Sequence, residues 1–174
     1  SNLKRRKQLS ESFVIMQQIW ISKYGMPENL EIRKTDIKLP AKNEVQIQVK
    51  AAGVNFADIL ARKGLYPDTP KAPCVVGYEV AGIIKAIGDE VDPVWLNKDV
   101  LALTHFGGYS EIVNVPIKQV YLKPNNLTFE QAAAIPVNYL TAYQLLVVMG
   151  SLSHDETILI QNAGGGVGLA ALDI

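Results

Sequence analysis

The sequence is poor in the residues that bind metals or form cross-links: among 174 residues it has one cysteine and two histidines. The single thiol, Cys74, excludes an internal disulfide and a zinc site made of several cysteines, and it is typical of a reducing compartment. Basic and acidic residues balance at 17 each, so the chain lacks the basic surplus that nucleic-acid binding requires. No uninterrupted run of about 18 apolar residues occurs, so we expect no membrane span. The composition predicts a soluble, cytoplasmic protein without a nucleic-acid partner.

The first fifteen residues differ from the rest. They are mostly polar and contain the basic run Lys4-Arg5-Arg6-Lys7. A secretory signal needs an apolar segment of at least about seven residues after such a run, and residues 13–16 are too few. We therefore expect residues 1–15 to be a leader or tag without fixed structure. A basic membrane-surface or localisation signal is the alternative.

Apolar and polar side chains alternate along much of the chain between residue 17 and about residue 120, which predicts half-buried strands separated by Gly, Pro and Asn turns. The expected strands are 18–22, 30–37, 44–51, 80–87, 99–103, 109–115 and 120–122. One helix interrupts them at 56–63, with Asn55 as its N-cap and Gly64 just past its end. Many short strands with few helices favour a β-barrel or sandwich.

Helical signals dominate after residue 123. Thr128 and Gln131 have the spacing of a capping box and are followed by three alanines, which predicts a helix start. A further helix is expected over 139–149, capped by Asn138 and ended by Gly150.

The last segment has the order strand, glycine-rich turn, helix. Residues 157–160 are uniformly apolar or β-branched, as in a parallel strand covered on both faces, and we expect a helix from Leu169. Between them, Ala163, Gly165 and Gly168 have the spacing of a dinucleotide-binding fingerprint. In that motif the glycines let the backbone approach a pyrophosphate and let the helix pack closely, while the helix N-terminus holds the phosphates. A glycine-rich loop that binds nothing is the alternative.

Six motifs follow one another in a familiar order: residues 52–58 (AGVNFAD), 62–67 (RKGLYP), 76–82 (VGYEVAG), 130–136 (EQAAAIP), 138–143 (NYLTAY) and 163–168 (AGGGVG). Together they resemble the quinone oxidoreductase (ζ-crystallin) branch of the medium-chain dehydrogenase/reductase superfamily, and two of them look most like its vesicle amine transport protein 1 subgroup. The resemblance implies a mixed α+β and α/β chain, with a GroES-like, partly open β-barrel over 16–137. It implies the first strand, turn and helix of a truncated Rossmann domain over 138–174, with the active site in the cleft between the two.

The resemblance also bears on metal binding. Zinc-dependent members of the superfamily have a cysteine ligand where this sequence has Asn55, and a histidine ligand where it has Tyr78. Neither replacement is a good zinc ligand, so we expect no zinc. We expect Tyr78 to fill the space of the metal.

Without a metal, the implied chemistry is hydride transfer from NADPH to a quinone or an α,β-unsaturated carbonyl compound. We expect Asn55 and Tyr66 to be catalytic, because charge that develops on the acceptor oxygen needs a hydrogen-bond donor. Asn55 and Thr141 resemble residues next to the nicotinamide. An N-cap, a half-exposed turn tyrosine and an ordinary helix-start threonine are the purely structural alternatives, and Asp58 is expected to be a first-turn acid rather than a base. The remaining expected cofactor contacts are Asn162, Ala163, Gly165, Gly166, Val167 and Gly168.

The resemblance favours NADPH over NADH and a homodimer. Two alternatives stay open: an enoyl-thioester reductase, and a non-enzymatic relative with a structural or membrane-trafficking role. The sequence ends at Ile174, roughly 100 residues short of a complete dinucleotide-binding domain. We therefore expect this chain alone to hold NADPH only weakly, to be inactive, and to expose apolar surface around 158–160.

Overall fold

The computed structural model describes residues 15–174. Of the leader expected over 1–15, residues 1–14 lie outside the described part. Its last residue, Ile15, is the first residue of strand β1.

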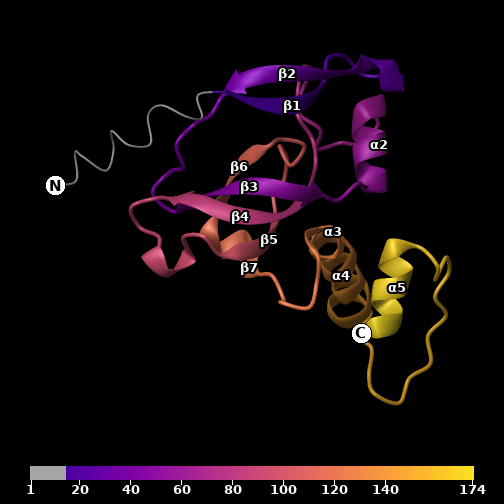
Figure 1. Ribbon diagram of the computed structural model, residues 1–174. Helices are drawn as coiled ribbons and strands as arrows, with labels where there is room; N and C mark the ends of the chain where they lie inside the picture. Colours follow the sequence, from indigo (N-terminus) through magenta and orange to yellow (C-terminus); the bar gives the residue numbers. More distant parts are fainter. Residues whose placement is uncertain (1–14) are drawn as a thin grey trace.

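The main sheet has five strands, all antiparallel, in the order β6-β3-β4-β5-β7 (Figure 1). They are β3 (Glu44–Ala52), β4 (Glu79–Ile87), β5 (Asp99–Leu103), β6 (Ile112–Pro116) and β7 (Val120–Leu122). The alternating apolar side chains meet in one core, with Val45, Ile47, Val80, Ile84 and Val100 fully buried. The strands expected from the period-two pattern are confirmed to within a few residues.

A separate two-stranded hairpin, β1 (Ile15–Ile21) and β2 (Leu30–Asp36), lies over the main sheet (Figure 1). Its end is attached by a backbone bridge between Ile21 and Cys74, with N–H to oxygen distances of 2.8 and 3.1 Å in the two directions. Because few backbone bonds join hairpin and sheet, the barrel formed by the described residues is only partly closed.

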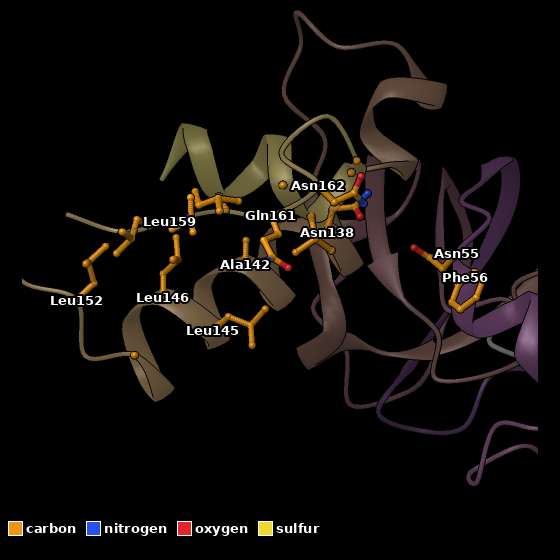
Figure 2. Close-up of a pocket in the computed structure, with 18 of the residues that line it drawn as sticks. Asn55, Phe56, Asn138, Ala142, Leu145, Leu146, Leu152, Leu159, Gln161 and Asn162 are labelled. Atoms are coloured by element: carbon orange, nitrogen blue, oxygen red, sulfur yellow. The ribbon is translucent and has the colours of Figure 1, made fainter. Parts of the chain in front are cut away.

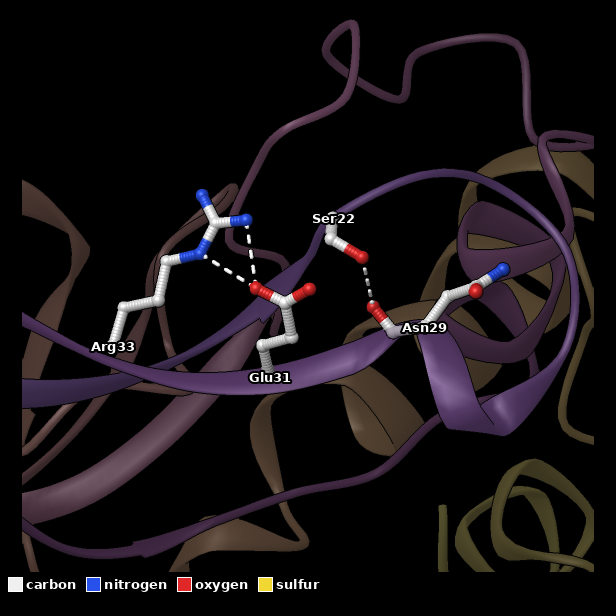
Figure 3. A network of polar contacts seen from close by, with 4 residues as sticks. All are labelled: Ser22, Asn29, Glu31 and Arg33. Carbon is white, nitrogen blue, oxygen red and sulfur yellow. Dashed lines mark hydrogen bonds and ion pairs between the residues drawn. The ribbon is translucent and has the colours of Figure 1, made fainter.

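The hairpin turn contains the short helix η1 (Pro27–Asn29). The Ser22 hydroxyl donates to the Asn29 carbonyl at 2.8 Å, and beside it Arg33 and Glu31 form an ion pair at 2.8 Å (Figure 3). Both ion-pair side chains are well exposed, so we expect the pair to contribute little stability.

Helix α2 (Phe56–Lys63) has the predicted ends: Asn55 is its N-cap and Gly64 its C-cap, with φ 74°. Helix α3 (Phe129–Ala133) has the predicted capping box, in which Gln131 and Thr128 bond reciprocally at 3.0 and 3.2 Å. Short helices η2 (Pro93–Trp95) and η3 (Ile117–Gln119) lie in the connections.

Helix α4 (Pro136–Tyr143) continues into a π-helical segment, η4 (Gln144–Met149). The prediction of a helix that starts at residue 139 with Asn138 as its cap is wrong. Proline favours the first helical position, and a carboxylate from the barrel, Glu79, accepts a hydrogen bond from the first turn. Asn138 therefore lies inside the helix.

Helix α5 (Gly166–Asp173) starts three residues before the expected Leu169, with Gly165 at its N-cap position. The expected strand over 157–160 is not formed: this segment is paired with no other strand among residues 15–174, and Leu159 is 89% exposed. A strand requires a hydrogen-bonded neighbour, and the described chain offers this segment none.

One helical stretch, Phe129–Met149, is long and apolar enough to cross a membrane by length and composition alone. Its most apolar window has a mean hydropathy of 1.4 and is 22% buried, whereas the absence of an uninterrupted apolar run in the sequence predicts no span. Among the described residues, α3 contacts the main sheet and α4 contacts α5 and β5.

Candidate functional site

A cavity of about 700 Å³ lies between the start of α2 and the α4–α5 pair (Figure 2). Val54, Asn55 and Phe56 line it from the barrel side, and Asn138 and the glycine-rich turn line it from the other side. Of the expected site residues it brings together Asn55, Asn162, Gly165, Gly166, Val167 and Gly168.

Two glycines at the start of α5, Gly166 and Gly168, stand where a side chain would collide with backbone or with a neighbouring helix. A Cβ at Gly168 would lie 2.5 Å from the Asn162 carbonyl oxygen, and one at Gly166 would lie 2.6 Å from the Asn138 side-chain oxygen. Asn162 itself has a left-handed φ of 55°. The turn therefore allows α5 to begin directly at the cavity wall, where its first backbone N–H groups have no partner within the helix. Such a cradle fits a pyrophosphate.

Asn55 is held by two carboxylates. Its backbone N–H donates to Asp58 at 2.8 Å, and its side-chain Nδ2 donates to Glu79 Oε1 at 2.9 Å. Asp58 also accepts the N–H of Gly77 at 3.1 Å, so this first-turn acid, expected from the sequence, joins α2 to the barrel as well. Burial raises the pKa of both carboxyl groups, because desolvation disfavours the charged form.

The sequence pattern does not single out Glu79. It is 1% exposed, and its second oxygen accepts the N–H of Val137, in the first turn of α4, at 2.8 Å. A Cβ at Gly53 would lie 2.2 Å from Glu79 Oε1, so only glycine leaves room for this carboxylate. The available signal is an acidic residue at the start of a mostly apolar strand.

An aromatic cluster contains two of the expected residues. The ring centroids of Tyr66 and Tyr78 are 5.9 Å apart, and those of Tyr78 and Phe106 are 5.3 Å apart. The Tyr78 hydroxyl is buried without a hydrogen-bond partner among the described residues, and burial raises the pKa of this phenol. Tyr66 does not line the cavity of Asn55, so its catalytic role stays a prediction.

Two expected cofactor contacts lie outside the cavity. Thr141, on α4, is exposed and lines a shallow hollow beside Leu103 of β5. Ala163 is half-buried and packs against Gly168: a Cβ added to Gly168 would lie 2.6 Å from the Cα of Ala163. The roles of both residues stay predictions.

Within residues 15–174, no group of three or more His, Cys, Asp or Glu side chains is arranged to hold a metal ion. At the two positions that resemble zinc ligands, the Nδ2 of Asn55 is bonded to Glu79 and the phenol of Tyr78 is kept protonated by its raised pKa. This donor set does not fit zinc, which binds thiolate, imidazole or carboxylate.

Comparison with known proteins places these features in a family. Residues 41–125 match the alcohol dehydrogenase GroES-like domain. The mouse synaptic vesicle membrane protein VAT-1 homolog-like is 34% identical over 91% of this chain and 38% of its own length. A quinone oxidoreductase of Lama guanicoe is 37% identical over 92% of this chain and 49% of its own. The chain thus spans less than half the length of these two relatives.

Two solved structures share the fold. The crystal structure of Escherichia coli quinone oxidoreductase complexed with NADPH superposes with a TM-score of 0.81 and 37% identity, over 89% of this chain and 48% of that one. The CurK enoyl reductase gives a TM-score of 0.85 and 34% identity, over 90% and 50%. The expected fold, a GroES-like domain followed by the start of a Rossmann domain, is confirmed, except that the strand expected over 157–160 is not formed. The chain belongs to the medium-chain dehydrogenase/reductase superfamily, in the branch that contains the quinone oxidoreductases and the VAT-1 homologues.

Proposed function

We propose that the protein containing this chain is a zinc-independent oxidoreductase that transfers a hydride from NADPH to a quinone or an α,β-unsaturated carbonyl compound. The observation that carries the proposal is that Asn55 and the glycine-rich turn line the same cavity. The quinone oxidoreductase relative and the structural neighbour complexed with NADPH support it.

The backbone N–H groups at the start of α5 would hold the pyrophosphate of the cofactor. Gly165 is the N-cap of this helix and Gly168 lies in its first turn. Bound NADPH would supply the hydride. Asn55 would orient the nicotinamide from the barrel side, and the apolar side chains of Leu145 and Leu146 would exclude water from the cavity. Thr141 is retained as a proposed nicotinamide contact and Tyr66 as the proposed donor to the acceptor oxygen.

The donor chemistry at Asn55 and Tyr78 described above supports zinc-independence. We further propose that NADPH is preferred to NADH, that the protein acts in the cytoplasm as a homodimer, and that residues 1–174 alone bind NADPH too weakly for turnover. In this proposal the described residues would supply the pyrophosphate and nicotinamide part of a dinucleotide site. A fluorescence titration that gave micromolar binding of NADPH to the 174-residue chain would contradict the last point.

Two other functions have a specific observation in their favour. The CurK neighbour favours an enoyl reductase acting on thioesters. The names of the VAT-1 relatives, together with the apolar stretch 129–149, favour a membrane-associated role without catalysis.

The discriminating experiment is to mix the full-length protein with NADPH and panels of quinones, enones and enoyl thioesters, and to follow the nicotinamide absorbance. Turnover of quinones or enones supports the proposal, preference for thioesters favours the enoyl reductase, and tight NADPH binding without turnover favours the third function. Replacement Asn55→Ala is expected to slow turnover on the order of 10²-fold by loss of orientation. The exposed Asn125→Ala is the control and should match the wild type.

A further inference from the structure

We propose that Glu79 is a positioning residue that fixes the orientation of the side-chain amide of Asn55. In this orientation the side-chain oxygen, Oδ1, faces the cavity as an acceptor for a carboxamide N–H group. The inference rests on the proposed function for the identity of the ligand, the nicotinamide carboxamide.

The orientation of the amide follows from hydrogen-bond chemistry. An ionised carboxylate only accepts, so the amide end that faces Glu79 Oε1 at 2.9 Å must be the NH₂ end. The side-chain oxygen of Asn55 then points the other way. Figure 2 shows this oxygen directed toward the side of the cavity formed by Asn138 and Asn162.

The Glu79 carboxylate is itself held in place. It is 1% exposed, its other oxygen accepts the Val137 N–H at 2.8 Å, and the space beside it at Gly53 is too small even for a methyl group. The backbone of Asn55 is held independently by Asp58 at 2.8 Å. Both ends of the Asn55 side chain are therefore restrained, and a rotation of the amide would place two acceptors, Asn55 Oδ1 and Glu79 Oε1, against each other.

The cavity thus has opposite polarity at its two ends. The backbone N–H groups at the start of α5 suit an anion, whereas the oxygen of Asn55 suits a neutral donor. A primary carboxamide supplies such a donor, and an acetyl group of similar shape does not. A ligand that covers this partly buried oxygen without donating to it leaves the oxygen unpaired, and such a ligand binds more weakly.

The test uses the full-length protein and two probes, NADPH and its 3-acetylpyridine analogue, titrated by fluorescence. Wild type should prefer NADPH by about tenfold, the value of one hydrogen bond. In Glu79→Gln the side-chain oxygen is needed for the Val137 N–H, so the new NH₂ group faces Asn55 and turns its amide around. The preference for NADPH over the analogue should then disappear, with an affinity ratio of about one.

The double variant Glu79→Gln with Asn55→Asp should restore the preference, because an aspartate accepts from Gln on one side and still presents an oxygen to the cavity. Asn55→Asp alone puts two carboxylates together and should weaken the binding of both probes. The control is Glu90→Gln, an exposed glutamate paired with Lys42, which should keep the tenfold preference. A preference retained in Glu79→Gln, or not recovered in the double variant, would overturn the proposal.

A second measurement does not depend on the cofactor or on the folding of a variant. In ¹⁵N NMR spectra of the wild-type protein, one side-chain N–H of Asn55 should be protected from solvent exchange by its bond to Glu79. Absence of this protection overturns the positioning role. Failure of wild type to bind either probe, with the protection present, overturns the proposed function and leaves the orientation of Asn55 intact.

Discussion

Asp58 and Glu79 are carboxyl groups that the fold has almost removed from water, with exposed fractions of 4% and 1%. Each is satisfied by backbone or side-chain N–H donors. Burial nevertheless dominates, and the pKa of both is raised above the ordinary values of 3.8 and 4.5. The folded protein therefore binds protons at these sites more tightly than the unfolded chain does.

This raised affinity for protons predicts a pH dependence of stability. The stabilising contribution of the two groups is fully present below their ordinary pKa values, and it is lost as the pH rises through their raised pKa values in the folded state. The free energy of unfolding, measured in urea at a series of pH values from about 4 upward, should therefore decrease as the pH rises. Glu79→Gln should remove the part due to Glu79, and exposed Glu90→Gln should not. An identical pH slope in wild type and Glu79→Gln would contradict the assignment.

At the scale of elements, the packing of α5 on its turn depends on where glycine stands. An alanine at position 168 would bring its Cβ within 2.5 and 2.6 Å of backbone atoms of Asn162 and Ala163, so α5 would have to shift. An alanine at position 164 would meet nothing within 4 Å. The two glycines are four positions apart and differ in the room that the fold leaves them.

We therefore predict that Gly168→Ala destabilises the full-length protein by about 1–3 kcal/mol, the usual cost of overpacking, and weakens NADPH binding at least about tenfold. Gly164→Ala should change neither quantity appreciably. Thermal unfolding and fluorescence titration of the two variants provide the check. Equal behaviour of both variants would show that close packing at position 168 is not required.

At the scale of the whole molecule, the α4–α5 side carries large exposed apolar side chains. Leu159 is 89% exposed, Met149 70% and Leu172 64%. They lie on the unpaired segment 157–160, on η4 and on α5, respectively. Helix α4, which continues into η4, and helix α5 lie side by side (Figure 1). Exposed apolar patches of this kind mark surfaces that bind other surfaces.

The 174-residue chain is accordingly expected to associate in a concentration-dependent manner. Light scattering over a range of concentrations checks this. The double replacement Leu159→Gln and Met149→Gln should shift the chain toward the monomer. Leu39→Gln is the matched control, because Leu39 is 82% exposed but lies in the loop between β2 and β3. A wild-type chain that stays monomeric at high concentration would refute the expectation.

The sequence by itself determined the features that depend on near neighbours. Alternation over residues 44–51 predicts strand β3, and Asn55 and Thr128 are correctly assigned as helix N-caps. The spacing of Gly165 and Gly168 correctly marks a tight turn before a helix. Side chains within about four residues of one another settle these structures, so a spacing rule is sufficient.

Only the tertiary structure decided how the site is held together. Glu79 contacts Asn55 across 24 positions and Val137 across 58, and it caps α4 in place of the expected Asn138. The apolar segment 157–160 carries the local signal of a strand, yet it lacks a neighbour with which to pair. In each case the deciding group lies far away along the chain, so no local pattern reveals whether folding will bring it near.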